Sequence, residues 1–78
     1  MREIVIGKTY KHFKGNLYKV IDIAYDCESK GDKLDKMVVY EALYGDNKHW
    51  VRKYDDFISL VDKKKYPDVT QKYRFEEV

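Results

Sequence analysis

MVVYEALYGDNKHWVR (residues 37–52) is the stretch that decides the fold of this chain, because it predicts a β-hairpin. Apolar and aromatic residues fill positions 37–44, and the turn signal Gly-Asp-Asn-Lys follows at 45–48. Positions 49–52 then form a short returning run. Gly, Asp and Asn tolerate the positive φ that tight hairpin connections require, so the turn agrees with the two strands beside it.

The hairpin also predicts which side chains share a face, because residues two apart in a strand point the same way. Trp50 and Arg52 therefore lie on one face of the returning strand, and His49 and Val51 lie on the other. The first strand carries bulk on both faces: Met37, Val39 and Leu43 on one, and Val38, Tyr40, Ala42 and Tyr44 on the other. Such a strand is central, or it packs a core on one side and presents a functional surface on the other.

The composition predicts one small folded domain covering residues 1–78. Hydrophobic residues make up 44% of the chain and aromatic residues 15%, which is typical of a globular protein and not of a disordered one. A chain this short buries only about 60–65% of the surface of its unfolded form. It therefore has little material for a deep catalytic cavity in addition to a core.

The charge balance and the cysteine count restrict the classes of partner and compartment. Sixteen basic and fourteen acidic residues give a net charge of +2, which is too small to indicate a nucleic-acid partner by bulk charge alone. Cys27 is the single cysteine, so no internal disulfide can form. With no signal peptide and no long apolar run, we expect a soluble, cytoplasmic protein without a membrane partner.

The rest of the chain predicts further strands. Residues 9–13 and 71–78 are short strand candidates, and 17–26 is the longest one. The apolar alternation of 17–26 is imperfect, which indicates a curved strand with a bulge that shifts the faces midway. Residues 1–6 form an edge strand or a loosely held arm, and residues 27–36 form a polar loop.

After Arg52 the apolar period changes to that of a helix. Phe57, Leu60 and Val61 fall on one face of a helix of about two turns. The lysine run 63–65 suits the C-terminal end of that helix, and it is interpreted as a solvated helix end more readily than as a phosphate-binding site. The whole pattern predicts a mostly β protein, a small SH3-like barrel of about five short strands with one short helix. An OB-like barrel is the alternative.

Several blocks of the chain are also similar to a known family. In order and spacing, the chain from residue 7 to about 61 resembles the bacterial family called domain of unknown function 1653. The matching blocks are HFKG at 12–15, VVY at 38–40, LYG at 43–45 and WVR at 50–52, with Phe57 and a closing Arg74-Phe75. The chain departs from the family pattern where Lys53 and Tyr73 replace Pro, and where Asp56 replaces Met. The resemblance implies a small, mostly β, stand-alone protein, and it implies no established activity.

No residue pattern predicts catalysis, so we expect neither an enzyme nor a bound cofactor. His12 and His49 show none of the usual spacing of metal ligands, and we expect no metal site. Cys27 lies between two acidic residues, which raise a thiol pKa and disfavour a nucleophile. Adjacent carboxylates such as Asp55 and Asp56 do not have the spacing of an acid–base pair.

The strongest candidate site is an aromatic face on the central hairpin. Tyr40, Tyr44 and Trp50 with Arg52 form a platform with a cationic edge, and His12 and Lys14 lie on its rim. Such a surface stacks a base, a sugar or a Pro-rich peptide. The opposing interpretation places Trp50 in the core, where a small domain needs its aromatic residues.

These residues predict a small binding module for a nucleic acid, a nucleotide or a partner peptide. The competing prediction is a structural or interaction protein that forms a homodimer by edge-strand pairing. A third and weaker prediction is a small hydrolase-like enzyme that uses His12. The sequence leaves the chain as a monomer or a homodimer.

Overall fold

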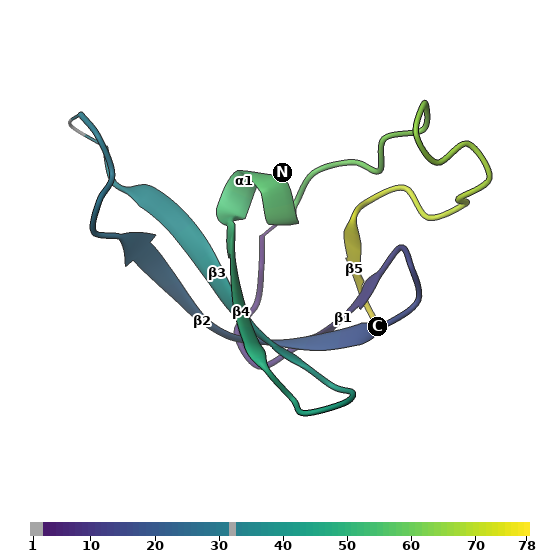
Figure 1. The fold of residues 1–78 in the computed structure, drawn as a ribbon, viewed down its shortest axis with the longest axis horizontal. Helices are drawn as coiled ribbons and strands as arrows, with labels where there is room; N and C mark the ends of the chain where they lie inside the picture. Colours follow the sequence, from purple (N-terminus) through teal and green to yellow (C-terminus); the bar gives the residue numbers. More distant parts are fainter. Residues whose placement is uncertain (1–2, 32) are drawn as a thin grey trace.

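The computed structural model of this protein describes residues 3–31 and 33–78, and within them five strands form one antiparallel sheet of order β4-β3-β2-β1-β5. The elements are β1 (Thr9–His12), β2 (Leu17–Asp26), β3 (Asp35–Ala42), β4 (His49–Lys53), α1 (Tyr54–Phe57) and β5 (Phe75–Glu77). The sheet curls around α1, and the long connection, residues 58–74, passes from α1 to β5 beside the β1–β2 turn (Figure 1). The predicted mostly β fold with one short helix is confirmed.

The sheet is open. β4 and β5 are its two edges, and no pairing joins them within the described residues. The predicted closure into a barrel is therefore not confirmed. These edge strands have only five and three residues. Within the long connection, Leu60 forms an isolated bridge with Tyr73.

The bend of the sheet comes from β2, which spans the predicted residues 17–26. Its first part pairs with β1, and its whole length pairs with β3. The β2–β3 register passes from Val20–Tyr40 to Asp22–Val39, which leaves Ile21 as an extra residue. Such a bulge bends a strand and changes which residues face the core. The predicted bulge is thus confirmed.

Aromatic side chains dominate the core on the face of the sheet that curls around α1, hereafter the inner face. The buried cluster consists of Tyr10, Val20, Val38, Tyr40, Phe57 and Phe75. Phe57 of α1 stacks on Phe75 of β5, with ring centres 4.0 Å apart and planes 4° apart. Although α1 has a single turn, it therefore supplies a central side chain of the core.

The N-terminal segment is an arm, as one of the two predicted alternatives held. Residues 3–6 form no strand, and residues 1 and 2 of the predicted segment lie outside the described part of the chain. The backbone N–H of Ile4 donates to the hydroxyl of Tyr54 at 3.1 Å, and that of Val5 donates to the hydroxyl of Tyr10 at 3.0 Å. Two tyrosine hydroxyls thus hold the arm against the core.

The predicted two-turn helix is wrong in length. The backbone of residues 59–61 bonds to residues 72–74: the N–H of Val61 donates to the carbonyl of Lys72 at 2.9 Å, and the N–H of Arg74 to that of Ser59 at 2.9 Å. These bonds replace the helical ones, so Leu60 is exposed. The lysine run 63–65 consequently lies in a turn of the long connection and not at a helix end. No helix of the described residues is long and apolar enough to cross a membrane.

Candidate binding face of the sheet

The strand register places the two predicted site residues of β4 on the inner face. Trp50 lies opposite Tyr40, and Arg52 lies opposite Val38. The side chains of Tyr40 and Val38 are both in the core. His49 lies opposite Glu41, on the outer face. The predicted division of the β4 side chains between two faces is therefore confirmed.

Trp50 is not a core residue. It is 48% exposed, and Tyr44, at the end of the β3–β4 hairpin, is 44% exposed. Both line a pocket of about 210 Å³ whose other lining residues are Ala42, Gly45, Asp46 and Lys48. The interpretation of Trp50 as the main core side chain is wrong, because Phe57 and Phe75 fill that place from outside the hairpin.

The ring of Tyr40 packs in the core, and its hydroxyl contacts a residue of the candidate site. It is 5% exposed, so its ring is not part of an open platform. The Nε of Arg52 donates to this hydroxyl at 3.3 Å. The guanidinium carbon of Arg52 lies 5.8 Å from the ring centre of Phe75. Arg52 is thereby held above the aromatic core, at the border between the core and solvent.

A second arginine lies beside the first, and sequence reasoning did not include it in the site. The Nη1 of Arg52 lies 2.8 Å from one carboxylate oxygen of Asp56, and the Nη2 of Arg74 lies 3.8 Å from the other. The Nε of Arg74 also donates to the Ser59 hydroxyl at 3.2 Å. Asp56 thus bridges two guanidinium groups. Arg74 reaches this place through the pairing of residues 59–61 with 72–74, for which the local sequence carries no signal.

His12 lies at the centre of the cationic groups. Its ring centre is 4.9 Å from that of Phe75 and 4.4 Å from that of Phe13. Its pKa falls to about 4, because burial disfavours the charged imidazole and because Arg52, Arg74 and Lys14 repel it. The Nδ1 accepts a hydrogen bond from the backbone N–H of Lys14 at 3.1 Å, so the proton of the neutral ring is on Nε2. His12 is therefore a neutral hydrogen-bond donor near neutral pH.

Tyr18 joins the predicted residues into one surface, and it was also missed. Its hydroxyl shares a 2.7 Å hydrogen bond with that of Tyr44. Its ring packs edge-on against those of Tyr40, Tyr44 and Phe75, at 5.4, 5.5 and 5.7 Å. Burial and the hydrogen bond with Tyr44 raise the pKa of Tyr18 to about 12. Its position two residues before the buried Val20 was the signal that placed it on the inner face.

Lys14 lies in the turn between β1 and β2. Its ammonium nitrogen is 5.9 Å from the ring centre of Phe13 and 5.6 Å from that of Tyr66 in the long connection. His49 does not approach His12, because it lies on the outer face beside Glu41 at 3.8 Å. Within residues 3–31 and 33–78, no group of three or more His, Cys, Asp or Glu side chains is placed to hold a metal ion.

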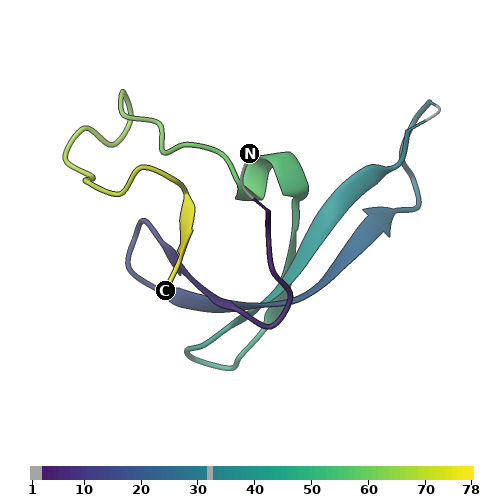
Figure 2. The same cartoon turned by 180° about the vertical axis from the view of Figure 1, so that it is seen from behind.

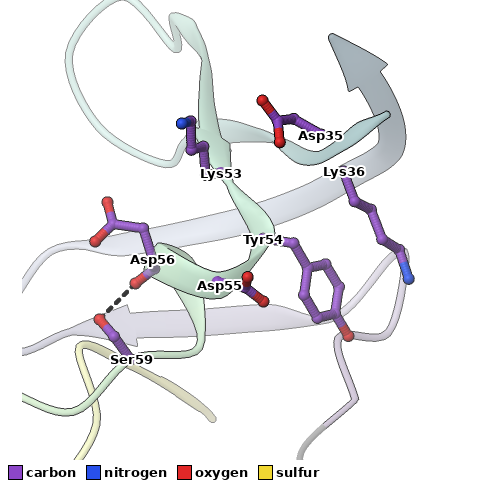
Figure 3. Close-up of a pocket in the computed structure, with 7 residues that line it drawn as sticks. All are labelled: Asp35, Lys36, Lys53, Tyr54, Asp55, Asp56 and Ser59. Carbon is purple, nitrogen blue, oxygen red and sulfur yellow. Dashed lines mark hydrogen bonds between the residues drawn. The ribbon is translucent and has the colours of Figure 1, made fainter. Parts of the chain in front are cut away.

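A separate pocket of about 410 Å³ lies beside α1. Figure 3 shows its lining residues, Asp35, Lys36, Lys53, Tyr54, Asp55, Asp56 and Ser59. The ammonium nitrogen of Lys36 lies 4.4 Å from the ring centre of Tyr54, and the Ser59 hydroxyl donates to the backbone carbonyl of Asp56 at 2.6 Å. Three aspartates and two lysines line this pocket, so it does not present charge of a single sign.

The fold and this face together define a class: a small, mostly β protein with an aromatic, cationic surface on one side of an open sheet. Residues 8–77 match the family described as "Protein of unknown function (DUF1653)", and the chain belongs to that family. The resemblance seen in the sequence blocks is thus confirmed. No curated protein and no solved structure matches the chain.

Proposed function

We propose that this protein is a binding module that takes a nucleotide unit of a single-stranded nucleic acid on its inner face. One observation carries the proposal: the exposed rings of Trp50 and Tyr44 border a pocket on the same face as the Arg52 guanidinium. Exposed aromatic rings stack bases, and a guanidinium binds phosphate through paired N–H donors. A ligand with a flat ring and an attached anion satisfies both.

The size of the pocket favours a single ring system. Pockets for drug-sized ligands measure roughly 300–1,000 Å³, and the one between Trp50 and Tyr44 measures about 210 Å³. A peptide bound in an extended conformation needs a longer groove with successive pockets. The peptide ligand is therefore the weaker alternative for this face.

The cationic surroundings of His12 support an anionic ligand. Arg52, Arg74 and Lys14 all act on its pKa, so three cationic groups converge on one part of the face. Only Asp56 offsets the two guanidinium groups, within the described ion pairs. We infer that the carboxylate of Asp56 occupies the place that a ligand phosphate would take, and that it competes with the phosphate.

We also assign the open sheet to the SH3-like class of small barrels, in preference to an OB-like barrel. The strand order and a long, bent β2 that belongs to both halves of the sheet support this assignment. The proposed setting is the cytoplasm of a bacterium, where single-stranded nucleic acid is abundant.

The test is a titration that follows the fluorescence of Trp50 with adenosine monophosphate, a short single-stranded RNA and a proline-rich peptide. We expect a saturable change with the two nucleotide probes that weakens as salt rises, since phosphate contacts are salt-dependent. Arg52→Ala should weaken this binding. Asp56→Asn should strengthen it, because the Asp56 carboxylate then no longer competes with the phosphate for the two guanidinium groups. Lys53→Ala is the matched control, because it removes one charge at the neighbouring position, on the outer face.

Two results would contradict the proposal. A Trp50 signal that responds to the peptide alone, without salt dependence, would assign the face to a protein partner. Equal loss of affinity in Arg52→Ala and Lys53→Ala would show that only the total charge matters. Circular dichroism of each variant must first show an intact fold.

The competing proposal is a homodimer formed by edge-strand pairing. It rests on the open edges of β4 and β5, and on Val51 of β4, which is 63% exposed. Light scattering distinguishes the two proposals. A dimer that dissociates in Val51→Lys, with nucleotide binding absent, would favour the pairing of two copies.

A further inference from the structure

The positive charge of this chain is concentrated in two segments. Residues 8–16 contain three lysines and no carboxylate, and residues 58–74 contain five cationic residues and two carboxylates. Together they have a net charge of +6. The rest of the chain contains eight cationic and twelve acidic residues, and its net charge is −4. The total of +2 therefore conceals a strongly basic part.

The fold brings these two segments side by side. The backbone N–H of Phe13 donates to the carbonyl of Arg74 at 3.0 Å, and the Nε2 of Gln71 donates to the carbonyl of Lys11 at 2.8 Å. The rings of Phe13 and Tyr66 lie 4.8 Å apart. Figure 2 shows the long connection running next to the β1–β2 turn from the opposite side. The two basic segments thus form one surface.

The lysines of this surface have different environments. The ammonium of Lys63 donates to the carbonyls of Val69 and Gln71, so it ties the long connection together. The ammonium nitrogens of Lys14 and Lys65 lie 5.6 and 5.7 Å from the ring centre of Tyr66. In the described part of the chain, the ion pairs involve only His49, Arg52 and Arg74 as cations. Lys14 and Lys65 therefore have no carboxylate partner there.

This surface is continuous with the inner face. A row of ring contacts connects Phe75 to His12 at 4.9 Å, His12 to Phe13 at 4.4 Å, and Phe13 to Tyr66 at 4.8 Å. Arg52 lies above Phe75 at one end of this row, and Lys14 and Lys65 lie over Tyr66 at the other. A row of rings, of which Phe75 is buried, thus connects Arg52 at one end to Lys14 and Lys65 at the other.

We propose that Lys11, Lys14 and Lys65, with the rings of Phe13 and Tyr66, form a basic surface that binds the sugar-phosphate backbone of a single-stranded nucleic acid. The proposal rests on the proposed function, since one nucleotide of the same strand occupies the pocket at Trp50. A nucleic-acid strand presents both phosphates and flat rings along its length, which matches the presence of both cationic groups and aromatic rings on this path. An acidic peptide or an anionic lipid surface presents the charge without the rings.

A concave region supports this surface. A pocket of about 340 Å³ lies between the β1–β2 turn and the long connection. Its lining residues are Lys11, Phe13, Lys14, Gly15, Asp68, Val69, Thr70 and Gln71. The ammonium groups of Lys11 and Lys14 in this lining can donate to phosphate oxygens, whereas the Nε2 of Gln71 already donates to the carbonyls of Lys11 and Tyr73.

The experiment compares Lys11→Gln/Lys65→Gln with Lys30→Gln/Lys33→Gln, because Lys11 lines the concave region and, unlike Lys14, is not assigned to the inner-face site. The control pair loses the same charge in the β2–β3 loop, at the opposite end of the sheet (Figure 1). The probes are adenosine monophosphate and a labelled single-stranded RNA of about 12 nucleotides, within the ~4–16 nucleotides that comparable small domains cover. Affinities are measured by fluorescence anisotropy for the RNA and by Trp50 fluorescence for the monophosphate, at several salt concentrations.

Each lost phosphate contact should reduce the salt slope by about 0.7 for a single strand, so the test pair should reduce it by about 1.4. By the same relation, the loss of one contact lowers the affinity at about 0.1 M salt about fivefold, taking about 1 M salt as the reference. The test pair should therefore lower the affinity for the RNA about 25-fold. Affinity for the monophosphate should stay unchanged, because it does not extend beyond the inner face. The control pair should leave the salt slope nearly unchanged.

The outcomes separate the two proposals. If the test pair behaves like the control pair while Arg52→Ala still loses the monophosphate, the basic surface is refuted and the inner-face proposal stands. If RNA binding is lost in the test pair but Trp50 never responds, the basic surface stands and the inner-face proposal fails. Tighter binding of a duplex than of the single strand, or binding of anionic vesicles without RNA binding, would refute the single-strand assignment.

Discussion

Acidification should destabilise this protein through His12. The folded state holds the pKa of this imidazole at about 4, below its usual value of 6.5, because of burial and the nearby Arg52, Arg74 and Lys14. A lowered histidine pKa means that the unfolded chain binds the proton more readily. The stabilisation is therefore complete above pH 6.5, and it is lost as the pH falls from 6.5 toward 4.

The magnitude follows from the distance between these pKa values. At pH 5, His12 is almost fully protonated in the unfolded chain and mostly neutral in the folded one. At about 1.4 kcal/mol per pH unit, a fully shielded group would lose about 2 kcal/mol between pH 6.5 and pH 5. Because His12 is only half-buried, solvent screening reduces the expected loss to roughly 1 kcal/mol. A loss of this size lowers the unfolding temperature of a small domain by about 4–8 °C.

The assay is urea unfolding, followed by circular dichroism, at steps between pH 7.5 and pH 4.5. Wild type should lose roughly 1 kcal/mol more than His12→Gln over this range, and His49→Gln is the matched control because its side chain lies on the outer face. The subtraction removes the titration of the carboxylates, which both proteins share. An identical pH dependence in wild type and His12→Gln would refute the reasoning.

The same group reports on ligand binding. A phosphate bound by Arg52 and Arg74 would offset the positive charge that His12 experiences, so its pKa should rise in the complex. An NMR titration of the imidazole, with and without adenosine monophosphate, measures this directly. A bound ligand that leaves the titration of His12 unchanged would place the phosphate elsewhere.

Three further changes test the fold. Phe57→Ala should cost about 3–5 kcal/mol of unfolding free energy, because it removes the ring stacked on Phe75. Leu60→Ala should change the free energy of unfolding by less than about 0.5 kcal/mol in the same urea titration. A large effect would show that Leu60 is buried, as the predicted two-turn helix requires. Tyr18→Phe should cost about 0.5–1.5 kcal/mol through the lost hydrogen bond to Tyr44, and alkaline absorbance titration should lose its last-ionising tyrosine. If the late ionisation persists in that variant, the raised pKa belongs to another tyrosine.

The strands were predictable because their signals are local. The alternation of apolar residues in 17–26 and 37–44, with glycine-containing turns between the strands, depends only on neighbours in the chain. The bulge in β2 was visible as a break in that alternation, and the register confirms it at Ile21. The shared face of Trp50 and Arg52 followed from strand geometry alone.

The helix prediction failed where a distant segment intervened. The spacing of Phe57, Leu60 and Val61 is helical, but the backbone of 59–61 pairs with 72–74. Arg74 entered the candidate site by the same pairing. The place of Trp50 was equally undetermined, since its burial depends on whether a side chain from another element covers it.

The sequence by itself determined the strands of the central hairpin, the mostly β class, the family and the total charge of +2. The tertiary structure alone decided which aromatic rings are buried, where Asp56 bridges two arginines, and that the basic segments 8–16 and 58–74 lie together. The physical reason is the range of the interactions. Backbone geometry couples residues two to four apart, whereas packing and electrostatics join residues about 60 positions apart, such as Lys11 and Gln71, which no local pattern records.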